Sequence, residues 1–301
     1  MGGTRFIGKS LVKKLCQKGY ELTLFTRGNN PIPNDVDHVI GDRKNNQDLS
    51  KLSSRKFDVI IDTSGRNLSD TESVLNQTGI PNYRYVYISS AGVYKKSEII
   101  PVDEDFLIDH DSRHIGKAIT EKWLVNNKIP FTSFRPTYIY GPGNYNPIES
   151  WFFDRLIHRR PIPVPGNGET ITQLGHVSDL AKAISMSLAS EKANNKIYNC
   201  SGKKGITFKG LIDLAAITVG INNQDIEIMS FDPSKLDPKA RKCFPLRIEH
   251  FFTDTSSLEK DLNWIEDYSL NDGFKDSFEN DYLLEKSREP DFTSDYKLFS
   301  L

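Results

Sequence analysis

The sequence predicts an α/β protein with a doubly wound parallel sheet and a smaller α/β lobe in its C-terminal half. In the first half, short apolar runs alternate with amphipathic segments, a pattern that is typical of βαβ units. A glycine-rich loop at residues 2–8 leads directly into the first predicted helix. We therefore divide the 301 residues into a Rossmann-type nucleotide-binding core, residues 1–142, and a smaller lobe, residues 143–301, whose segments interleave with the core.

Each expected element follows from the spacing of its apolar residues. In the first helix, Ile7, Leu11 and Leu15 recur at i, i+4 and i+8, and Gly19 ends the pattern. Strands of the core are predicted at 21–26, 36–40, 57–62, 84–89 and 131–135. Its helices are predicted at 6–18, 68–78 and 112–127. The lobe is predicted to have helices at 147–159, 178–190, 207–219 and 269–284, and strands near 162–164, 172–177, 197–200 and 225–229.

The first strand of the core is missing from this sequence. In a doubly wound fold the glycine loop follows a central strand that pairs on both sides, but here Met1 stands immediately before Gly2. A gap is therefore expected between the strands at 21–26 and 57–62. Either a neighbouring strand has moved inward, or the natural start lies upstream, which we favour. We then expect an in-frame apolar stretch and another start codon before Met1, and poor expression or weak dinucleotide binding without them. An in-frame stop codon just before Met1 would refute this.

Composition excludes several classes of protein. Lys and Arg number 39 against 40 Asp and Glu, and this balance argues against non-specific coating of nucleic acid. No apolar run approaches the roughly 20 residues of a membrane span, and the N-terminus has no signal or transit pattern. Cys16, Cys200 and Cys243 are too widely spaced to suggest disulfides or a thiolate metal site. We expect a reduced, cytoplasmic protein with no membrane association.

The loop Gly2-Gly-Thr-Arg-Phe-Ile-Gly8 is predicted to bind the pyrophosphate of a dinucleotide, because its glycines allow backbone N–H groups to approach closely. In NAD-selective proteins the next strand ends in an acidic residue. Here it ends in Thr26-Arg27-Gly28, and a guanidinium suits a 2′-phosphate, so NADP is favoured over NAD. Alternatively, Arg5 and Arg27 are solvated loop residues. The predicted cofactor site comprises Gly2, Gly3, Thr4, Arg5, Phe6, Ile7, Gly8, Arg27, Asp42, Ser64 and Lys117.

Several strings beyond the loop resemble those of known families. With the glycine loop, four strings resemble extended short-chain dehydrogenases, which include nucleotide-sugar epimerases: Tyr87-Ile-Ser-Ser-Ala-Gly-Val-Tyr94, Arg135-Pro, Tyr140-Gly-Pro142 and His176-Val-Ser-Asp179. A closer resemblance, to the chloroplast stem-loop-binding protein family, covers nearly the whole chain. It rests on Ser112-Arg-His-Ile-Gly-Lys117, Tyr140-Gly-Pro-Gly-Asn-Tyr-Asn-Pro147, Trp151-Phe-Phe153, Arg160-Pro-Ile-Pro-Val-Pro165, Gln173-Leu-Gly-His-Val177 and Pro290-Asp-Phe-Thr293. The resemblance implies an atypical member of the superfamily from an oxygenic phototroph, in a family associated with binding and cleaving RNA stem-loops.

The superfamily's catalytic group is altered in this sequence. Its reaction uses a Tyr as acid or base, a Lys four residues later and a Ser or Thr that orients the substrate. Ser90 and Lys117 match the last two, but Arg113 stands at the Tyr position, and a guanidinium cannot exchange a proton near pH 7. Tyr94 is expected on a cofactor-side loop, and His114 is expected to point elsewhere from its neighbour. We therefore expect negligible hydride transfer on nucleotide sugars.

Other candidate ligand sites are less specific. Related epimerases carry an Arg that grips the substrate diphosphate where this chain has Thr172, so that clamp is lost. Basic clusters at 158–160, 203–204 and 239–247, with Phe244 and Phe251-Phe252 nearby, suit phosphates and stacked bases. Alternatively these are solvated faces and core aromatics. The histidines show no ligand spacing, His176 is expected to be structural, and no metal site is assigned.

Three functions therefore remain open. The first is an NAD(P)-binding protein associated with RNA stem-loops, with endoribonuclease activity implied only by resemblance. The second is a nucleotide-sugar epimerase, dehydratase or reductase that uses Ser90, Lys117 and an unrecognised acid or base. The third is a dinucleotide sensor without turnover. A small-molecule ligand of the C-terminal lobe and homo-oligomer formation are compatible with each.

Overall fold

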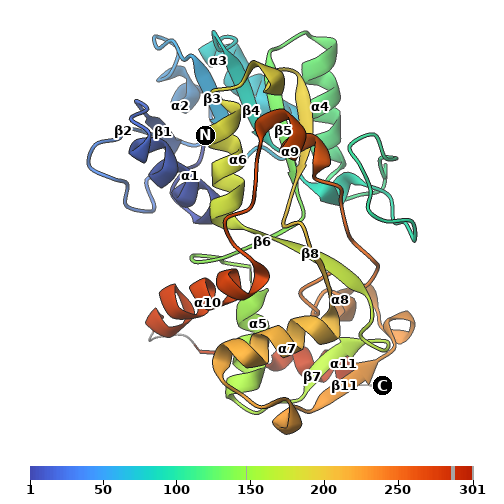
Figure 1. Cartoon of the computed structure of the whole chain (residues 1–301). Coiled ribbons are helices and arrows are strands. Elements are labelled where there is room, and N and C mark those ends of the chain that lie inside the picture. Colours follow the sequence, from blue (N-terminus) through green and yellow to red (C-terminus); the bar gives the residue numbers. More distant parts are fainter. Residues whose placement is uncertain (147, 286–288, 300–301) are drawn as a thin grey trace.

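The computed structural model describes residues 1–146, 148–285 and 289–299. Figure 1 shows a core of parallel strands and flanking helices, which includes α6 and α9 of the second half, with most of the other elements of the second half below it. The strands of the core are β1 (Thr23–Thr26), β2 (Asp37–Ile40), β3 (Val59–Asp62), β4 (Arg84–Ile88), β5 (Phe131–Pro136) and β9 (Lys196–Cys200). Its helices are α1 (Phe6–Gln17), α2 (Asn46–Ser50), α3 (Leu68–Thr78), α4 (Ile115–Asn126), α6 (Val177–Ser187) and α9 (Ser256–Leu262).

The main sheet of the core is parallel throughout, in the order β3-β4-β5-β9. Every residue of β4 and β5 is buried, as expected for strands in the middle of a parallel sheet that is covered on both faces. The second half of the chain also contributes to this core. β9 forms one edge of the sheet, and α6 packs against α1 with the fully buried Trp264 in the same apolar cluster.

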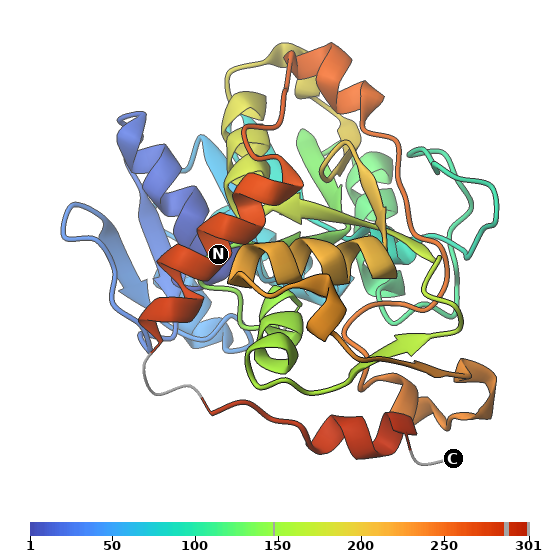
Figure 2. The same ribbon diagram turned by 60° about the horizontal axis from the view of Figure 1, so that its bottom comes forward.

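The lobe contains the remaining elements. A three-stranded sheet is formed by β6 (Tyr138–Tyr140), β8 (Ile171–His176) and β10 (Gly205–Thr207), and a separate parallel pair by β7 (Ile162–Pro165) and β11 (Ile228–Phe231). Its helices are α5 (Glu149–Ile157), α7 (Phe208–Val219), α8 (Pro238–Arg241), α10 (Leu270–Asn280) and α11 (Thr293–Phe299). Figure 2 shows α7 and α10 side by side on one face of the lobe. Short 3-10 turns cover Ala91–Val93, Glu191–Ala193, Asn223–Asp225, Pro233–Lys235 and Tyr282–Leu284.

Some predicted boundaries are wrong. The helix expected at 112–127 begins only at Ile115, and the helix expected at 269–284 ends at Asn280. The strand expected near 225–229 is Ile228–Phe231, and Pro147, the expected start of α5, lies outside the described residues. The sequence did not predict α2, β6, β10, α8, α9 and α11, which have three to seven residues each. Helices of this length are too short to show an apolar period.

The expected gap in the core is present, and no neighbouring strand has closed it. β1 and β2 form a sheet of their own, and Figure 1 shows the N-terminus beside β1 and β3. The Met1 ammonium donates to the Ile61 carbonyl (2.7 Å), Thr63 N–H donates to the Met1 carbonyl, and Gly2 N–H donates to the Phe25 carbonyl. Met1 therefore occupies the place of one residue of a parallel strand between β1 and β3.

A cavity of about 970 Å³ adjoins Met1 and is lined by residues of both β1 and β3. Its apolar walls include Leu11, Leu15, Leu22, Val59 and Ile61. Because pairing groups alternate along a strand, the backbone groups of every second residue of β1 and β3 face this cavity. The space therefore has the apolar walls and the hydrogen-bonding groups that one further extended strand requires.

An apolar strand fused ahead of Met1 should stabilise the protein. An extension ending in Val-Leu-Val-Ile would hydrogen-bond to β1 and β3, and each such bond contributes about 0.5–1.5 kcal/mol. We expect a rise in Tm of about 5–10 °C by scanning calorimetry. The matched control is an extension of equal length made of Gly, Ser and Asp. Equal Tm values for the two fusions would show that the cavity does not accept a strand.

Candidate dinucleotide site and adjoining cationic cluster

The glycine loop has the geometry that a pyrophosphate site requires. Gly2 and Gly3 have φ values of +84° and +114°, which favour glycine. A Cβ on Gly8 would lie 2.6 Å from the Cα of Gly3, so the first turn of α1 packs directly on the loop. The N-cap residue Arg5 makes no side-chain capping bond, which leaves first-turn N–H groups for an anion. These residues therefore fit the pyrophosphate of a dinucleotide.

The other predicted cofactor residues lie at the carboxyl ends of neighbouring strands, where ligands bind in open α/β sheets. Arg27 is exposed directly after β1, and Asp42 follows β2 and accepts from Lys44 N–H (2.9 Å). Ser64 follows β3, with its Cβ 3.7 Å from the position of a Cβ on Gly2. Arg5 instead stacks on the Tyr145 ring, 4.0 Å from its centroid.

A buried ion pair that the sequence did not predict supports this edge. Arg43 makes two hydrogen bonds to the fully buried carboxylate of Asp62 (2.7 and 2.8 Å), which also accepts from the Tyr85 hydroxyl and from Gly65 N–H. Burial alone would raise the pKa of Asp62, but Arg43 and the Met1 ammonium outweigh it and hold that pKa well below its usual range. The only sequence signal was an Asp at the end of a buried strand.

Replacing Asp62 should destabilise the protein. In Asp62→Asn the Arg43 guanidinium would stay buried without a counter-charge, and breaking such a pair costs about 3–5 kcal/mol. We expect a loss of this size in the free energy of unfolding, measured with urea at neutral pH. Asp58→Asn is the control, because Asp58 is an exposed carboxylate beside the same strand. Equal losses in the two variants would contradict the structural role of the pair.

Lys117 and Ser90, the predicted catalytic residues, lie at the same edge. The Lys117 ammonium donates to the carbonyls of Gly65 (3.1 Å) and Ile88 (2.6 Å), and its burial lowers its pKa to about 8. The Ser90 hydroxyl accepts from Gly92 N–H (3.1 Å) at the start of a 3-10 turn. Lys117 therefore joins the ends of β3 and β4 and still carries its charge near neutral pH.

The expectation for His114 was wrong, whereas Tyr94 lies in the segment after β4 as expected but with its side chain buried. The Tyr94 side chain is 1% exposed, and its hydroxyl donates to the side-chain oxygen of Asn199 in β9 (2.7 Å). Tyr94 therefore belongs to the core. His114 lies in the turn before α4, beside Arg113, whose Nε donates to its Nε2 (3.0 Å). A Cβ on Gly92 would lie 3.1 Å from both the Nε2 of His114 and the hydroxyl of Ser90, so the imidazole faces the Ser90 turn.

Four cationic side chains lie close enough to His114 to affect its pKa. Burial, together with the positive charges of Arg113, Lys117, Arg247 and Arg66, lowers that pKa to about 4. We call these four residues the cationic cluster. They come from the loop after β3, the turn before α4, α4 itself and the lobe. Their convergence produces a local concentration of positive charge in a protein whose net charge is −1.

Close packing assembles the cluster. A Cβ on Gly116 would lie 2.7 Å from the carbonyl oxygen of Arg66, so only glycine lets α4 approach this loop. From the lobe, the Arg247 guanidinium lies over the Phe251 ring, 4.5 Å from its centroid. Phe251 in turn meets the Tyr138 ring edge to face at 5.8 Å. The cluster therefore has an aromatic wall on its lobe side.

The other candidate ligand residues are mostly structural. Phe244, predicted to stack bases, is 3% exposed within the aromatic core of the lobe. Thr172 is fully buried in β8, where it pairs with Ile206 of β10. His176 caps α6 and stacks on Tyr268, with ring centroids 3.8 Å apart, which confirms its structural role. The basic residues at 158–160 pack partly against Phe292.

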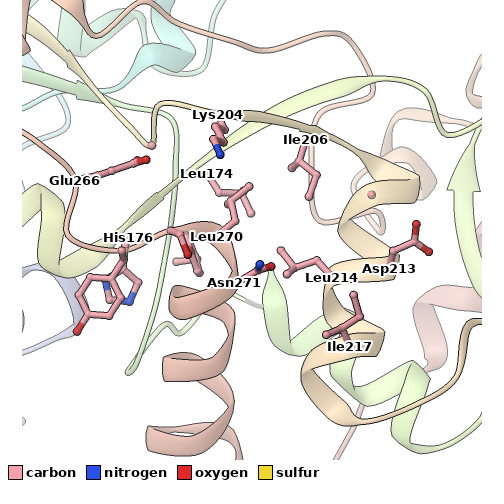
Figure 3. Close-up of a pocket in the computed structure, with 15 residues that line it drawn as sticks. Leu174, His176, Lys204, Ile206, Asp213, Leu214, Ile217, Glu266, Leu270 and Asn271 are labelled. Atoms are coloured by element: carbon pink, nitrogen blue, oxygen red, sulfur yellow. The ribbon is translucent and has the colours of Figure 1, made fainter.

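The lobe contains a cavity of about 350 Å³ of its own. Figure 3 shows Lys204 and Glu266 near one side of it and Leu214 and Ile217 of α7 near the other. The cationic cluster contributes nothing to its lining. Within the described ranges, no group of three or more His, Cys, Asp or Glu side chains is placed to hold a metal ion. No helix of the same residues is long and apolar enough to cross a bilayer.

Comparison with known proteins assigns the family. The model of the NAD dependent epimerase/dehydratase family matches residues 1–201. The chain belongs to this family. It is also 43% identical to the chloroplast stem-loop binding protein of 41 kDa b of Arabidopsis thaliana, over 100% of this chain and 83% of the relative. A putative UDP-glucose 4-epimerase of Methanocaldococcus jannaschii is 25% identical over 91% of this chain and 94% of its own.

Solved structures of nucleotide-sugar epimerases share the fold. The UDP-glucose 4-epimerase of Thermotoga maritima, determined with UDP-glucose, superposes with a TM-score of 0.78 at 18% identity and covers 95% of this chain and 98% of its own. The UDP-glucuronic acid 4-epimerase of Bacillus cereus, in complex with UDP-glucuronic acid and NAD, gives 0.76 at 18% identity over 93% and 97%. The fold is therefore α/β with a Rossmann-type parallel sheet, and its family typically binds NAD(P).

Reversing the charge of Arg27 should weaken NADP binding selectively. If Arg27 binds the 2′-phosphate as the sequence predicts, Arg27→Asp removes a charge-assisted contact worth about 1.5–3 kcal/mol. We expect the Kd for NADP to rise about 10–100-fold by titration calorimetry, while the Kd for NAD does not rise. Lys13→Asp, on the exposed face of α1, is the matched control. An unchanged affinity for NADP would contradict the assignment of Arg27.

Proposed function

We propose that this protein binds NADP and structured RNA, and that the cationic cluster beside the dinucleotide site holds RNA phosphates. The observation that carries the proposal is the convergence of Arg66, Arg113, Lys117 and Arg247 on one histidine. The resemblance to a relative named for binding stem-loops supports the choice of RNA as the anion. A bound NADP would supply hydride chemistry, but the residues around it do not favour the superfamily reaction.

Arg113 changes the chemistry of the position at which the superfamily has Tyr. A phenol exchanges a proton, whereas a guanidinium stays charged and presents several donors to an anion. Arg113 is exposed, and its Nε is already directed to His114, which leaves its terminal nitrogens for a phosphate. The side chain at this position is therefore suited to anion binding rather than to proton transfer.

The aromatic wall suits the unpaired bases of a loop. Single-stranded RNA is recognised largely by stacking on aromatic rings and on guanidinium planes. Tyr138 and Arg247 are both partly exposed, and the Arg247 guanidinium lies over the Phe251 ring. A stem-loop would thus place its phosphates on the cationic cluster and its loop bases against this wall.

A nucleotide-sugar enzyme is the second candidate. Ser90 and Lys117 are retained, and His114, uncharged at neutral pH, faces the Ser90 turn. These features favour an enzyme that uses His114 in place of the missing Tyr. The buried Thr172 disfavours a sugar diphosphate. Formation of NADPH from NADP with UDP-sugars, absent in His114→Gln, would support this second candidate.

RNA affinity should depend on the cationic cluster. In fluorescence anisotropy with a labelled stem-loop, Arg113→Ala combined with Arg247→Ala should weaken binding about 10–100-fold, because each residue neutralises one phosphate. The slope of log K against log salt should also fall by about 1.5. Arg241→Ala with Lys242→Ala is the matched control, since both residues are exposed on the lobe away from the cluster. An unchanged affinity in the first variant, or an equal loss in the control, would contradict the proposal.

A further inference from the structure

We propose that dinucleotide and RNA exclude one another, because both ligands need the Lys117 end of the site. The inference rests on the proposed function and adds its regulation: free dinucleotide would set the fraction of protein that carries RNA. It follows from the order in which the ligand-facing residues lie along the carboxyl edge of the sheet.

The dinucleotide site runs continuously into the cationic cluster. The glycine loop lies against the residues after β3, where a Cβ on Gly2 would be 2.5 Å from the Thr63 hydroxyl. Two residues later, the Gly65 carbonyl accepts from the Lys117 ammonium, and Arg66 follows at once. A dinucleotide anchored at the loop and extended along this edge therefore reaches the cluster within three residues of chain.

The two halves of the dinucleotide meet different surroundings. The half on the β1 side would lie near Arg27, which belongs to neither the cluster nor its aromatic wall. The half on the β4 side would lie between the glycine loop and Ser90, in the space that Lys117 and His114 face. Only this second half would occupy the positions that we assign to RNA phosphates.

Charge strengthens the exclusion. Lys117 is half-buried at the ends of β3 and β4 and holds its proton with a pKa of about 8. A ligand that neutralises this cation therefore lowers its attraction for a second anion. A second polyanion beside a bound dinucleotide would also meet the repulsion of its phosphates. By linkage, RNA must weaken dinucleotide binding by the same factor by which dinucleotide weakens RNA binding.

The test is a competition experiment on the whole protein with a fluorescent stem-loop RNA, after NADP binding has been measured separately by calorimetry. NADP at 100 times its Kd should raise the apparent Kd for RNA about 100-fold. Adenosine 2′,5′-bisphosphate, which carries only the Arg27 half, should displace little RNA at matched occupancy. Arg27→Asp should raise the NADP concentration needed for displacement, because it weakens NADP binding.

The outcomes separate this inference from the proposed function. If the RNA does not bind in the absence of nucleotide, the proposed function fails and the inference fails with it. If RNA binds and saturating NADP leaves its Kd unchanged, the exclusion is wrong and RNA binding stands. If adenosine 2′,5′-bisphosphate displaces RNA as effectively as NADP, the shared region lies at the Arg27 end, which also overturns the inference.

Discussion

The buried carboxylate of Asp62 holds together the edge of the sheet at which ligands are expected to bind. It pairs with Arg43, accepts from Gly65 N–H and attracts the Met1 ammonium, so three separate segments meet on one side chain. Gly65, fixed in this way, presents its carbonyl to Lys117. The glycine loop, the loop after β3 and α4 therefore owe their relative positions to a single charge that stays ionised because Arg43 compensates its burial.

At the same edge, one substitution changes the chemistry of a position in a fold that is otherwise shared with the superfamily. The superfamily places a proton-exchanging phenol beside a lysine, and this chain has Arg113 there instead. Burial, together with the positive charges of Arg113 and its neighbours, lowers the pKa of His114. In the proposed function these charges bind anions, while the surrounding sheet retains the family's architecture.

Local features of the site were predictable from the sequence, whereas long-range contacts were not. The glycine loop, Ser90, Lys117 and the replacement at Arg113 could be read from short strings with fixed spacing. The pair of Arg43 with Asp62 and the approach of Arg247 depend on packing between distant segments, which no local pattern records. The orientation of His114 was predicted wrongly because α4 begins three residues later than predicted. Phe244 was predicted to bind bases because its sequence neighbours are basic, but its side chain lies in the core.

Photo-crosslinking tests the central claim most directly, because it locates RNA on the protein without relying on variants. A stem-loop with 4-thiouridine in its loop would be irradiated in complex with the whole protein, and the modified peptides identified by mass spectrometry. Binding at the cationic cluster predicts adducts on Tyr138 and on the segment 247–251, beside the turn at 112–117. Adducts confined to the basic segments 158–160 or 239–242 would contradict it.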